Sequence, residues 1–143
     1  MAAVSWYLDA SVLIALLTVE PFSDRADAFV SATPDPLLVS DFAGAEFASA
    51  IARRVRTRES TLSDAQRDLA DFDIWVERSA HRVGISPADI AVATTFLRRL
   101  DLTLRTPDAL HIAIVQRLDA TLVTFDRRMA DSARTLGIAV AVP

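Results

Sequence analysis

Short apolar runs alternate along the chain with longer segments whose apolar residues recur at the helical spacing of about 3.6 positions. Runs of this kind are typical of strands that are buried on both faces of a parallel sheet. They predict strands at residues 5–8, 37–39, 82–85, 121–124 and 138–142. The longer segments predict helices at residues 11–17, 24–31, 42–58, 63–79, 86–100, 106–118 and 126–136. Because strands and helices alternate, we expect one three-layer α/β/α domain over residues 1–143, with a central parallel sheet and crossover connections.

Residues with known capping roles mark several of the expected helix ends. The segment 63–66 (Ser-Asp-Ala-Gln) has the pattern of a capping box, which satisfies two backbone amides at a helix start. Pro87 falls at a first helical position, where its missing amide hydrogen does no harm. Gly137 directly follows the last expected helix and suits the left-handed backbone that often ends one.

The composition supports a well-filled core and removes several classes of chemistry. Hydrophobic residues make up 52% of the chain and charged residues 24%, which argues against disorder. There is no Cys, so disulfides, thiolate zinc sites and cysteine nucleophiles are excluded. All 15 basic residues are Arg, and the absence of Lys excludes P-loop phosphate binding, Schiff bases and Ser-Lys dyads. Without a membrane-length apolar stretch or a signal peptide in residues 1–9, we expect a cytoplasmic protein.

The net charge of −4 argues against a protein that coats nucleic acid by bulk electrostatics. It leaves room for a nuclease, because a local basic rim can lie beside an acidic metal site. The distribution of charge therefore matters more here than its sum.

Four acidic residues fall at strand ends or helix starts. Asp9 closes the first strand, and Asp126 follows the strand at 121–124 after one residue. Asp108 lies in the first turn of a helix and Glu46 in the second turn of another. In an open parallel sheet these positions share one edge, beyond the carboxyl ends of the strands, where ligands bind. We therefore expect the four carboxylates to converge.

Carboxylates that converge repel one another unless they are protonated or bind cations. Mg²⁺ and Mn²⁺ prefer oxygen ligands, and two such ions can activate a water and stabilise the leaving oxygen of a phosphodiester. Structural roles remain open for each residue: Asp9 and Asp126 could cap helices, and Asp108 suits a helix N-terminus. Glu46 lies among Ala and Phe residues, where a carboxylate needs a partner.

The segments that contain these carboxylates resemble the motifs of PIN-domain proteins, in particular the VapC toxins of bacterial type II toxin–antitoxin pairs. They are residues 7–14 (Tyr-Leu-Asp-Ala-Ser-Val-Leu-Ile), 40–46, 106–113 (Thr-Pro-Asp-Ala-Leu-His-Ile-Ala) and 122–127 (Leu-Val-Thr-Phe-Asp-Arg). The resemblance covers nearly the whole chain, with the motifs in the family's order and at comparable spacing.

The resemblance implies a PIN fold and a Mg²⁺- or Mn²⁺-dependent endoribonuclease that hydrolyses RNA phosphodiesters with a metal-activated water. Ser11 and Thr124 match the family's supporting hydroxyl positions. The resemblance also implies a homodimer and a small antitoxin protein that inhibits the nuclease. The residues that match its acidic, catalytic positions, and so would hold one or two ions, are Asp9, Glu46, Asp108 and Asp126.

Two groups of arginines are candidates for RNA contact. Arg127 and Arg128 directly follow Asp126 and are therefore the better candidates for the substrate. The second group lies near the end of the helix at 42–58, where phosphate contact and a solvated helix end are about equally plausible. Its members are Arg53, Arg54, Arg56 and Arg58.

Two further positions near the carboxylates bear on the site. His111 lies one turn beyond Asp108, and we interpret it as a partly buried His packed near the sheet rather than as a metal ligand. His81 has no visible partner and is expected on the surface. Phe125 departs from the family, in which many members carry a polar or basic residue, and this affects the expected substrate contact but not the carboxylates.

Two other functions are compatible with acidic groups at strand ends. One is a phosphoryl-accepting domain, such as a receiver or a haloacid-dehalogenase-like phosphatase, although both typically use a Lys that this chain lacks. The other is a PIN-like scaffold that binds without catalysis. The complete acidic set argues against the scaffold.

Overall fold

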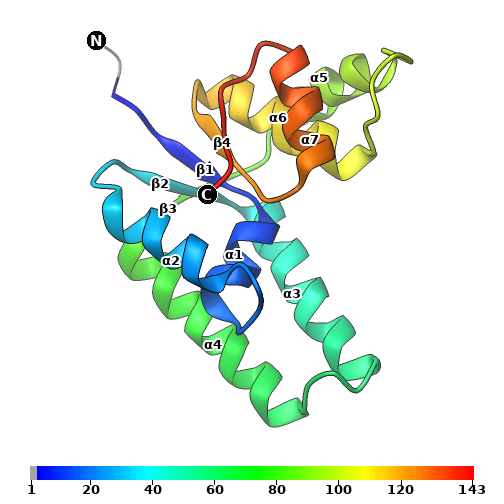
Figure 1. Cartoon of the computed structure of the whole chain (residues 1–143). Helices are drawn as coiled ribbons and strands as arrows, with labels where there is room; N and C mark the ends of the chain where they lie inside the picture. Colours follow the sequence, from blue (N-terminus) through cyan, green and yellow to red (C-terminus); the bar gives the residue numbers. More distant parts are fainter. Residues whose placement is uncertain (1–2) are drawn as a thin grey trace.

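The computed structural model describes residues 3–143, which contain a five-stranded sheet (Figure 1). Its strands are β1 (Trp6–Leu8), β2 (Leu37–Ser40), β3 (His81–Val83), β4 (Thr121–Val123) and β5 (Val140–Ala141). They lie in the order β3-β2-β1-β4-β5, and every neighbouring pair is parallel. The parallel sheet predicted from the apolar runs is confirmed.

The strand order reverses direction at β1, and this reversal creates the crevice that matters for function. The chain builds outward from β1 to β2 and β3 on one side and to β4 and β5 on the other. Leu8 pairs with Val123, so the segments that follow β1 and β4 emerge at the same level. Ligands of open parallel sheets bind beyond the carboxyl ends of the strands at such a switch point.

Helices cover both faces of the sheet, which gives the expected three layers. In residues 3–143 they are α1 (Ala10–Leu17), α2 (Ser23–Ala32), α3 (Asp41–Arg56), α4 (Leu62–Ser79), α5 (Pro87–Leu97), α6 (Thr106–Leu118) and α7 (Arg127–Thr135). Figure 1 shows α1 to α4 on one face and α5 to α7 on the other. None of these described helices is long and apolar enough to cross a membrane.

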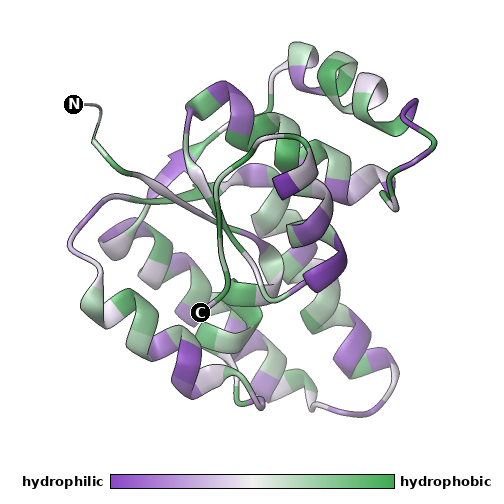
Figure 2. Cartoon of the chain, turned by 45° about the horizontal axis from the view of Figure 1, so that its top comes forward, coloured by the Kyte–Doolittle hydropathy of each residue, from purple (hydrophilic) through white to green (hydrophobic). Residues whose placement is uncertain are grey.

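Two apolar clusters, one on each face, hold the layers together. Tyr7 and Leu122 project into the cluster beneath α5, α6 and α7. Their neighbours Leu8 and Val123 project into the cluster beneath α1, α3 and α4, because successive strand residues face opposite sides. Each fully buried Leu or Val of these clusters contributes about 1.5–3 kcal/mol. Figure 2 shows hydrophilic and hydrophobic residues alternating around the helices, as expected when one face of each covers the sheet.

Helix α4 begins at Leu62, and its N-cap lies two residues before Ser63, so the capping box predicted at 63–66 is wrong. Thr61 is the actual N-cap: its backbone is extended, and its hydroxyl accepts a hydrogen bond from the amide of Asp64 at 3.1 Å. An N-cap residue needs this extended backbone, and Thr61 provides both the backbone and the hydroxyl before Ser63 is reached.

Several other boundaries also differ from the prediction. Strand β3 spans His81–Val83 rather than 82–85, because it pairs with Leu38–Ser40 and β2 ends where Ser40 begins to cap α3. Helix α5 stops at Leu97, before the expected end at Leu100. Gly137, by contrast, has a φ of 80° after α7, as predicted for a helix end.

Candidate active site

Asp9 directly follows β1 and lies at the switch point between β1 and β4. Its side chain caps α1, because Oδ1 accepts hydrogen bonds from the Val12 amide at 3.1 Å and from Ser11 Oγ at 2.6 Å. The residue is only 3% exposed. The capping role considered from the sequence is therefore real for Asp9, and it holds the carboxylate in a fixed orientation at the sheet edge.

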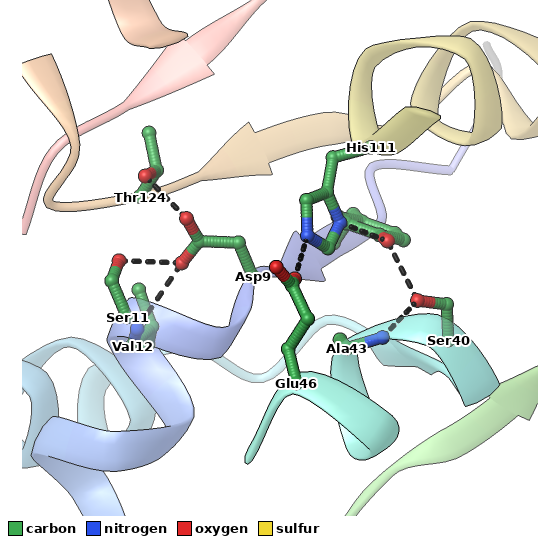
Figure 3. Close-up of polar contacts among 9 residues, drawn as sticks. Asp9, Ser11, Val12, Ser40, Ala43, Glu46, His111 and Thr124 are labelled. Atoms are coloured by element: carbon green, nitrogen blue, oxygen red, sulfur yellow. Dashed lines mark hydrogen bonds and ion pairs between the residues drawn. The ribbon is translucent and has the colours of Figure 1, made fainter. Parts of the chain in front are cut away.

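The second oxygen of Asp9 is bound from the neighbouring strand. Thr124, which follows β4, donates its hydroxyl to Asp9 Oδ2 at 2.5 Å (Figure 3). The same hydroxyl accepts the amide of Asp126 at 2.9 Å. Ser11 Oγ accepts the amide of Phe125 at 3.0 Å. The two hydroxyls therefore join the turn after β1 to the turn after β4, and Asp9 lies between them.

The charge of Asp9 is poorly compensated. Burial raises the pKa of its carboxyl above the ordinary value, and the hydrogen bonds from Ser11 and Thr124 oppose this only in part. Among the described residues no Arg forms an ion pair with Asp9. A bound cation would supply the missing compensation.

Glu46 reaches the same region from α3. Figure 3 shows its side chain extending toward His111 of α6, and Glu46 Oε1 forms a hydrogen bond with His111 Nε2. The side chain of Glu46 remains 32% exposed, whereas His111 is buried. The partner that a carboxylate needs in this apolar part of α3 is therefore a histidine from the opposite layer.

Asp108 and Asp126 both lie at helix N-termini on this edge. Asp108 Oδ2 accepts the amide of Arg105 at 3.1 Å, which is the carboxylate half of a capping box at the start of α6. Asp126 Oδ1 accepts the amide of Met129 at 3.1 Å and caps α7. Both structural alternatives considered from the sequence are therefore present. In each residue the other carboxylate oxygen accepts no hydrogen bond from residues 3–143.

The predicted residues thus share one edge of the sheet but do not form a closed ligand cage. Asp9, Ser11, Thr124 and Asp126 belong to one hydrogen-bonded network. Glu46 is tied to α6 by His111, one turn beyond Asp108. Across the part of the chain that the structure describes, no three acidic or histidine side chains stand close enough together to hold a metal ion.

The chemistry of the donor set nevertheless fits a hard divalent cation. Glu46 Oε2, Asp108 Oδ1 and Asp126 Oδ2 accept no hydrogen bond from within residues 3–143 and are available as oxygen ligands. Mg²⁺ and Mn²⁺ prefer such ligands and keep several waters, so they do not require a cage made of protein alone. The uncompensated charge of Asp9 favours a cation here.

Sequence reasoning missed the residues behind Glu46. Tyr7 OH lies 2.7 Å from His111 Nδ1 and 2.7 Å from Ser40 Oγ. His111 was expected to be partly buried near the sheet; it is 3% exposed and also packs against Phe42. The available signal was that a Tyr and a His in apolar runs both need hydrogen-bond partners. The sequence could not show that each is the other's partner.

A basic groove leads away from Glu46 along α3. It has a volume of about 500 Å³ and is lined by Glu46, Ser49, Ala50, Arg53, Arg54, Arg56 and Glu59. Arg54 is held by Glu20 at 3.3 Å, whereas Arg53 and Arg56 are exposed. Arg58 has a left-handed backbone, with a φ of 61°, just beyond the end of α3. The groove joins a cationic surface to one of the four carboxylates.

The start of α7 carries the other two candidate arginines. Arg127 and Arg128 are exposed and directly follow the cap residue Asp126. Phe125, the departure from the family pattern, stacks on Phe22 with ring centroids 4.7 Å apart. It therefore packs the turn after β4 against the segment before α2.

Comparisons with known proteins agree with this arrangement. The model of the PIN domain family matches residues 6–134. Ribonuclease VapC46 of Mycobacterium tuberculosis is 36% identical over 146 residues, covering 100% of this chain and 99% of the relative. The crystal structure of VapC20 of Mycobacterium tuberculosis, a Sarcin-Ricin loop cleaving toxin, has a TM-score of 0.73 at 15% identity, covering 89% of this chain and 94% of that one.

A second solved structure shares the whole fold. VapBC2 of Rickettsia felis, bound to a DNA fragment from their promoter, superposes with a TM-score of 0.72 at 16% identity, over 96% of this chain and 98% of that one. At 15% and 16% identity, these two structures support the fold alone. The match to the family model and the 36% identity to VapC46 support membership of the family. The chain therefore belongs to the PIN-domain family and, within it, to the VapC ribonucleases.

Proposed function

We propose that this protein is a Mg²⁺- or Mn²⁺-dependent endoribonuclease that hydrolyses RNA phosphodiesters as the toxin of a toxin–antitoxin pair. The observation that carries the proposal is the buried Asp9 carboxylate at the β1–β4 switch point, held by Ser11 and Thr124 without a cationic partner. The full-length similarity to ribonuclease VapC46 supports the reaction class. The match to the PIN model argues against a receiver or a haloacid-dehalogenase-like domain.

The carboxylates of the sheet edge are the proposed ligands of one or two ions: Asp9, Glu46, Asp108 and Asp126. When bound, the metal activates a water and stabilises the negative charge that develops on the phosphate. Ser11 and Thr124 hold the oxygens of Asp9 in place, so that the ligand does not have to be ordered when the ion arrives.

RNA contact is assigned to arginines on two sides of the carboxylates. Arg53 and Arg56 line the groove that ends at Glu46, and their exposed guanidinium groups suit backbone phosphates. Arg127 and Arg128 lie beside Asp126 at the start of α7. An RNA substrate is compatible with the acidic net charge, because these four exposed cations lie next to the proposed ligands Glu46 and Asp126.

The proposed partners follow from the family. A small antitoxin is the expected inhibitor, and the VapBC2 assembly on promoter DNA is a solved example from the same fold. We also propose that the protein acts in the cytoplasm as a homodimer, with residues 1–143 forming a single PIN domain.

Metal-dependent cleavage of RNA by the purified chain, free of antitoxin, is the direct test. We expect single-stranded RNA to be cut in Mg²⁺ or Mn²⁺ and to remain intact in EDTA. Asp9→Asn should lower the rate at least about a hundredfold, since it removes a charged ligand and each 1.36 kcal/mol is tenfold in rate. Asn is as good an N-cap as Asp, so helix α1 should remain folded.

Asp27→Asn is the matched control, because Asp27 is an exposed acid on α2 that is not one of the proposed ligands. It should cut RNA at the rate of the unmodified chain. Metal-independent cleavage, or full activity of Asp9→Asn, would contradict the proposal. A folded chain that binds neither metal nor RNA would instead indicate a non-catalytic PIN-like scaffold.

A further inference from the structure

A chain of hydrogen bonds, buried except at its Glu46 end, links β2 and β1 to α6 and ends on Glu46. Ser40 Oγ, at the end of β2, lies 2.7 Å from Tyr7 OH of β1. The same Tyr7 oxygen lies 2.7 Å from His111 Nδ1 of α6, and His111 Nε2 contacts Glu46 Oε1 (Figure 3). Ser40 Oγ also accepts the amide of Ala43 at 2.9 Å, which caps α3. Four elements of the fold therefore meet in one polar chain inside an apolar interior.

The direction in which each group of this chain donates its proton can be assigned by starting from Ser40, at the buried end. Ser40 is 1% exposed, so water does not reach its hydroxyl. One lone pair of Ser40 Oγ is occupied by the Ala43 amide, and the recorded partner for its own proton, within residues 3–143, is the oxygen of Tyr7. The Ser40 hydroxyl must therefore donate to Tyr7.

Tyr7 then has one direction left for its own proton. The residue is fully buried, and a tyrosine phenol, whose ordinary pKa is about 10, is protonated at neutral pH and can donate one hydrogen bond. With Ser40 donating to it, Tyr7 donates to His111 Nδ1, which is then an acceptor. The proton of the His111 ring lies on Nε2 and points to Glu46 Oε1.

If each hydrogen bond of the chain were donated in the opposite direction, the buried hydroxyl proton of Ser40 would be left without an acceptor. If His111 carried its proton on Nδ1, that N–H would donate to Tyr7, and Tyr7 would donate to Ser40. The Ser40 hydroxyl proton would then have no acceptor among the described residues, a loss of about 1–3 kcal/mol for a buried group. In addition, a bare Nε2 lone pair would face the Glu46 carboxylate and repel it.

We infer that Ser40, Tyr7 and His111 form a one-way hydrogen-bond chain that fixes the Nε2–H tautomer of His111 and makes this histidine a positioning residue for Glu46. The inference rests on the proposed function in one respect, because Glu46 is there a metal ligand. His111 binds Oε1 and leaves Oε2 for the cation. Partners that orient a ligand in this way typically change metal affinity or activity by about 10–100-fold when they are removed.

The tautomer can be measured in the metal-free protein by long-range ¹H–¹⁵N NMR at neutral pH. The chain has two His residues, and a His81→Gln variant assigns the signals, because His81 is exposed on β3. We expect His111 to show a protonated Nε2 and an unprotonated Nδ1. Tyr7→Phe, which keeps the ring in the core, should shift His111 toward a mixture of tautomers. An Nδ1-protonated or doubly protonated ring in the unmodified protein would overturn the inference.

Two substitutions of His111 separate positioning from packing. Gln can place an amide N–H near the position of Nε2, whereas the shorter Asn reaches only the position of Nδ1. We expect His111→Asn to bind Mn²⁺ at least about tenfold more weakly by calorimetry, with kcat lowered and KM for RNA unchanged. His111→Gln should stay within about threefold of the unmodified protein in both measurements.

Equal losses in the two variants, or no loss in either, would contradict a positioning role. Thermal unfolding checks that both variants fold, and Tyr7→Phe provides the same Mn²⁺ measurement if they do not, with about tenfold weaker binding expected. The NMR result does not depend on catalysis. If the protein cuts no RNA but shows the Nε2–H tautomer, the proposed function fails and the hydrogen-bond chain stands.

Discussion

Asp9 is both a helix cap and the least exposed of the proposed ligands. Its two oxygens accept hydrogen bonds from the Val12 amide and from two hydroxyls, one on its own turn and one on the next strand. Hydrogen bonds to a charged acceptor contribute about 1.5–3 kcal/mol each, which offsets part of the unfavourable burial. The hydroxyl of Thr124 is the more informative of the two, because it also accepts the amide of Asp126.

Thr124→Val is the substitution that tests this arrangement at the scale of one residue. Val has nearly the same shape but cannot donate to Asp9 Oδ2 or accept from the Asp126 amide. Since Thr124 is fully buried, water cannot replace the lost bonds, and we expect a loss of about 2–3 kcal/mol in the free energy of unfolding. Urea denaturation measures it.

Thr94→Val provides the comparison, because the Thr94 hydroxyl bonds to the carbonyl of Ile90 on an exposed face of α5. It should change the free energy of unfolding by no more than about 0.5 kcal/mol. Similar losses of unfolding free energy in the two variants would mean that the Thr124–Asp9 hydrogen bond stabilises the fold no more than an exposed one does.

How far the site could be predicted depends on the distance along the chain between interacting residues. Asp9 and Ser11 are two positions apart, so their contact follows from local geometry after a strand. The partnership of Tyr7 with His111 spans 104 positions and depends on which helix crosses which strand. No local pattern contains that information, so the sequence indicated the carboxylates but not what holds Glu46.

Helices α5 and α6 are joined by an ion pair that the sequence did not reveal. Arg117 of α6 donates from Nε and a terminal nitrogen to the two oxygens of Asp89 on α5, at 2.8 and 2.9 Å. Asp89 is buried, and its hydrogen bonds with Arg117 hold the pKa of its carboxyl below the ordinary value. The pair therefore links stability to pH at the scale of these two elements.

The pH dependence has a definite sign. The pKa of Asp89 is lower in the folded state than the unfolded value of about 3.9, so the pair contributes fully above about pH 5. Its contribution is lost as the pH falls through the folded pKa. We expect Asp89→Asn to lose about 2–3 kcal/mol in the free energy of unfolding at pH 7, less than for a fully buried pair because Arg117 is 37% exposed.

Urea denaturation of both proteins between pH 7 and pH 3 checks this, and the difference should narrow below about pH 4. Asp101→Asn removes an exposed Arg–Asp pair and should leave the curve almost unchanged. A difference that stays constant down to pH 3 would show that the charge of Asp89 is not what stabilises the α5–α6 contact.

The elements themselves were more predictable than their ends. Alternating apolar runs and helical segments identify every strand and helix of residues 3–143, because burial on both faces of a parallel sheet leaves a strong pattern. The predicted start of α4 and the predicted range of β3 were wrong. The start of α4 depends on which residue takes an extended backbone, and the range of β3 depends on the length of the neighbouring strand β2. Those are tertiary constraints.

At the scale of the whole molecule, the candidate site lies where the two helical layers meet across the sheet. Glu46 lies on α3 on one face, Asp108 lies in the first turn of α6 on the other, and Asp9 follows the central strand between them. A cation that bound these carboxylates would contact both layers at once. It would bind the folded chain and not the unfolded one, because the ligands lie far apart in sequence.

Metal binding should therefore raise the stability of the entire protein. At a metal concentration about a hundred times the dissociation constant, linkage adds about 2.7 kcal/mol, which raises the unfolding midpoint of a domain of this size by about 5–10 °C. Thermal unfolding of the EDTA-treated chain, with and without Mn²⁺, measures the shift. Asp9→Asn should lose most of it, whereas Asp27→Asn should keep it. Equal shifts in the two variants would place the cation elsewhere, since a metal held by the sheet edge must depend on its central carboxylate.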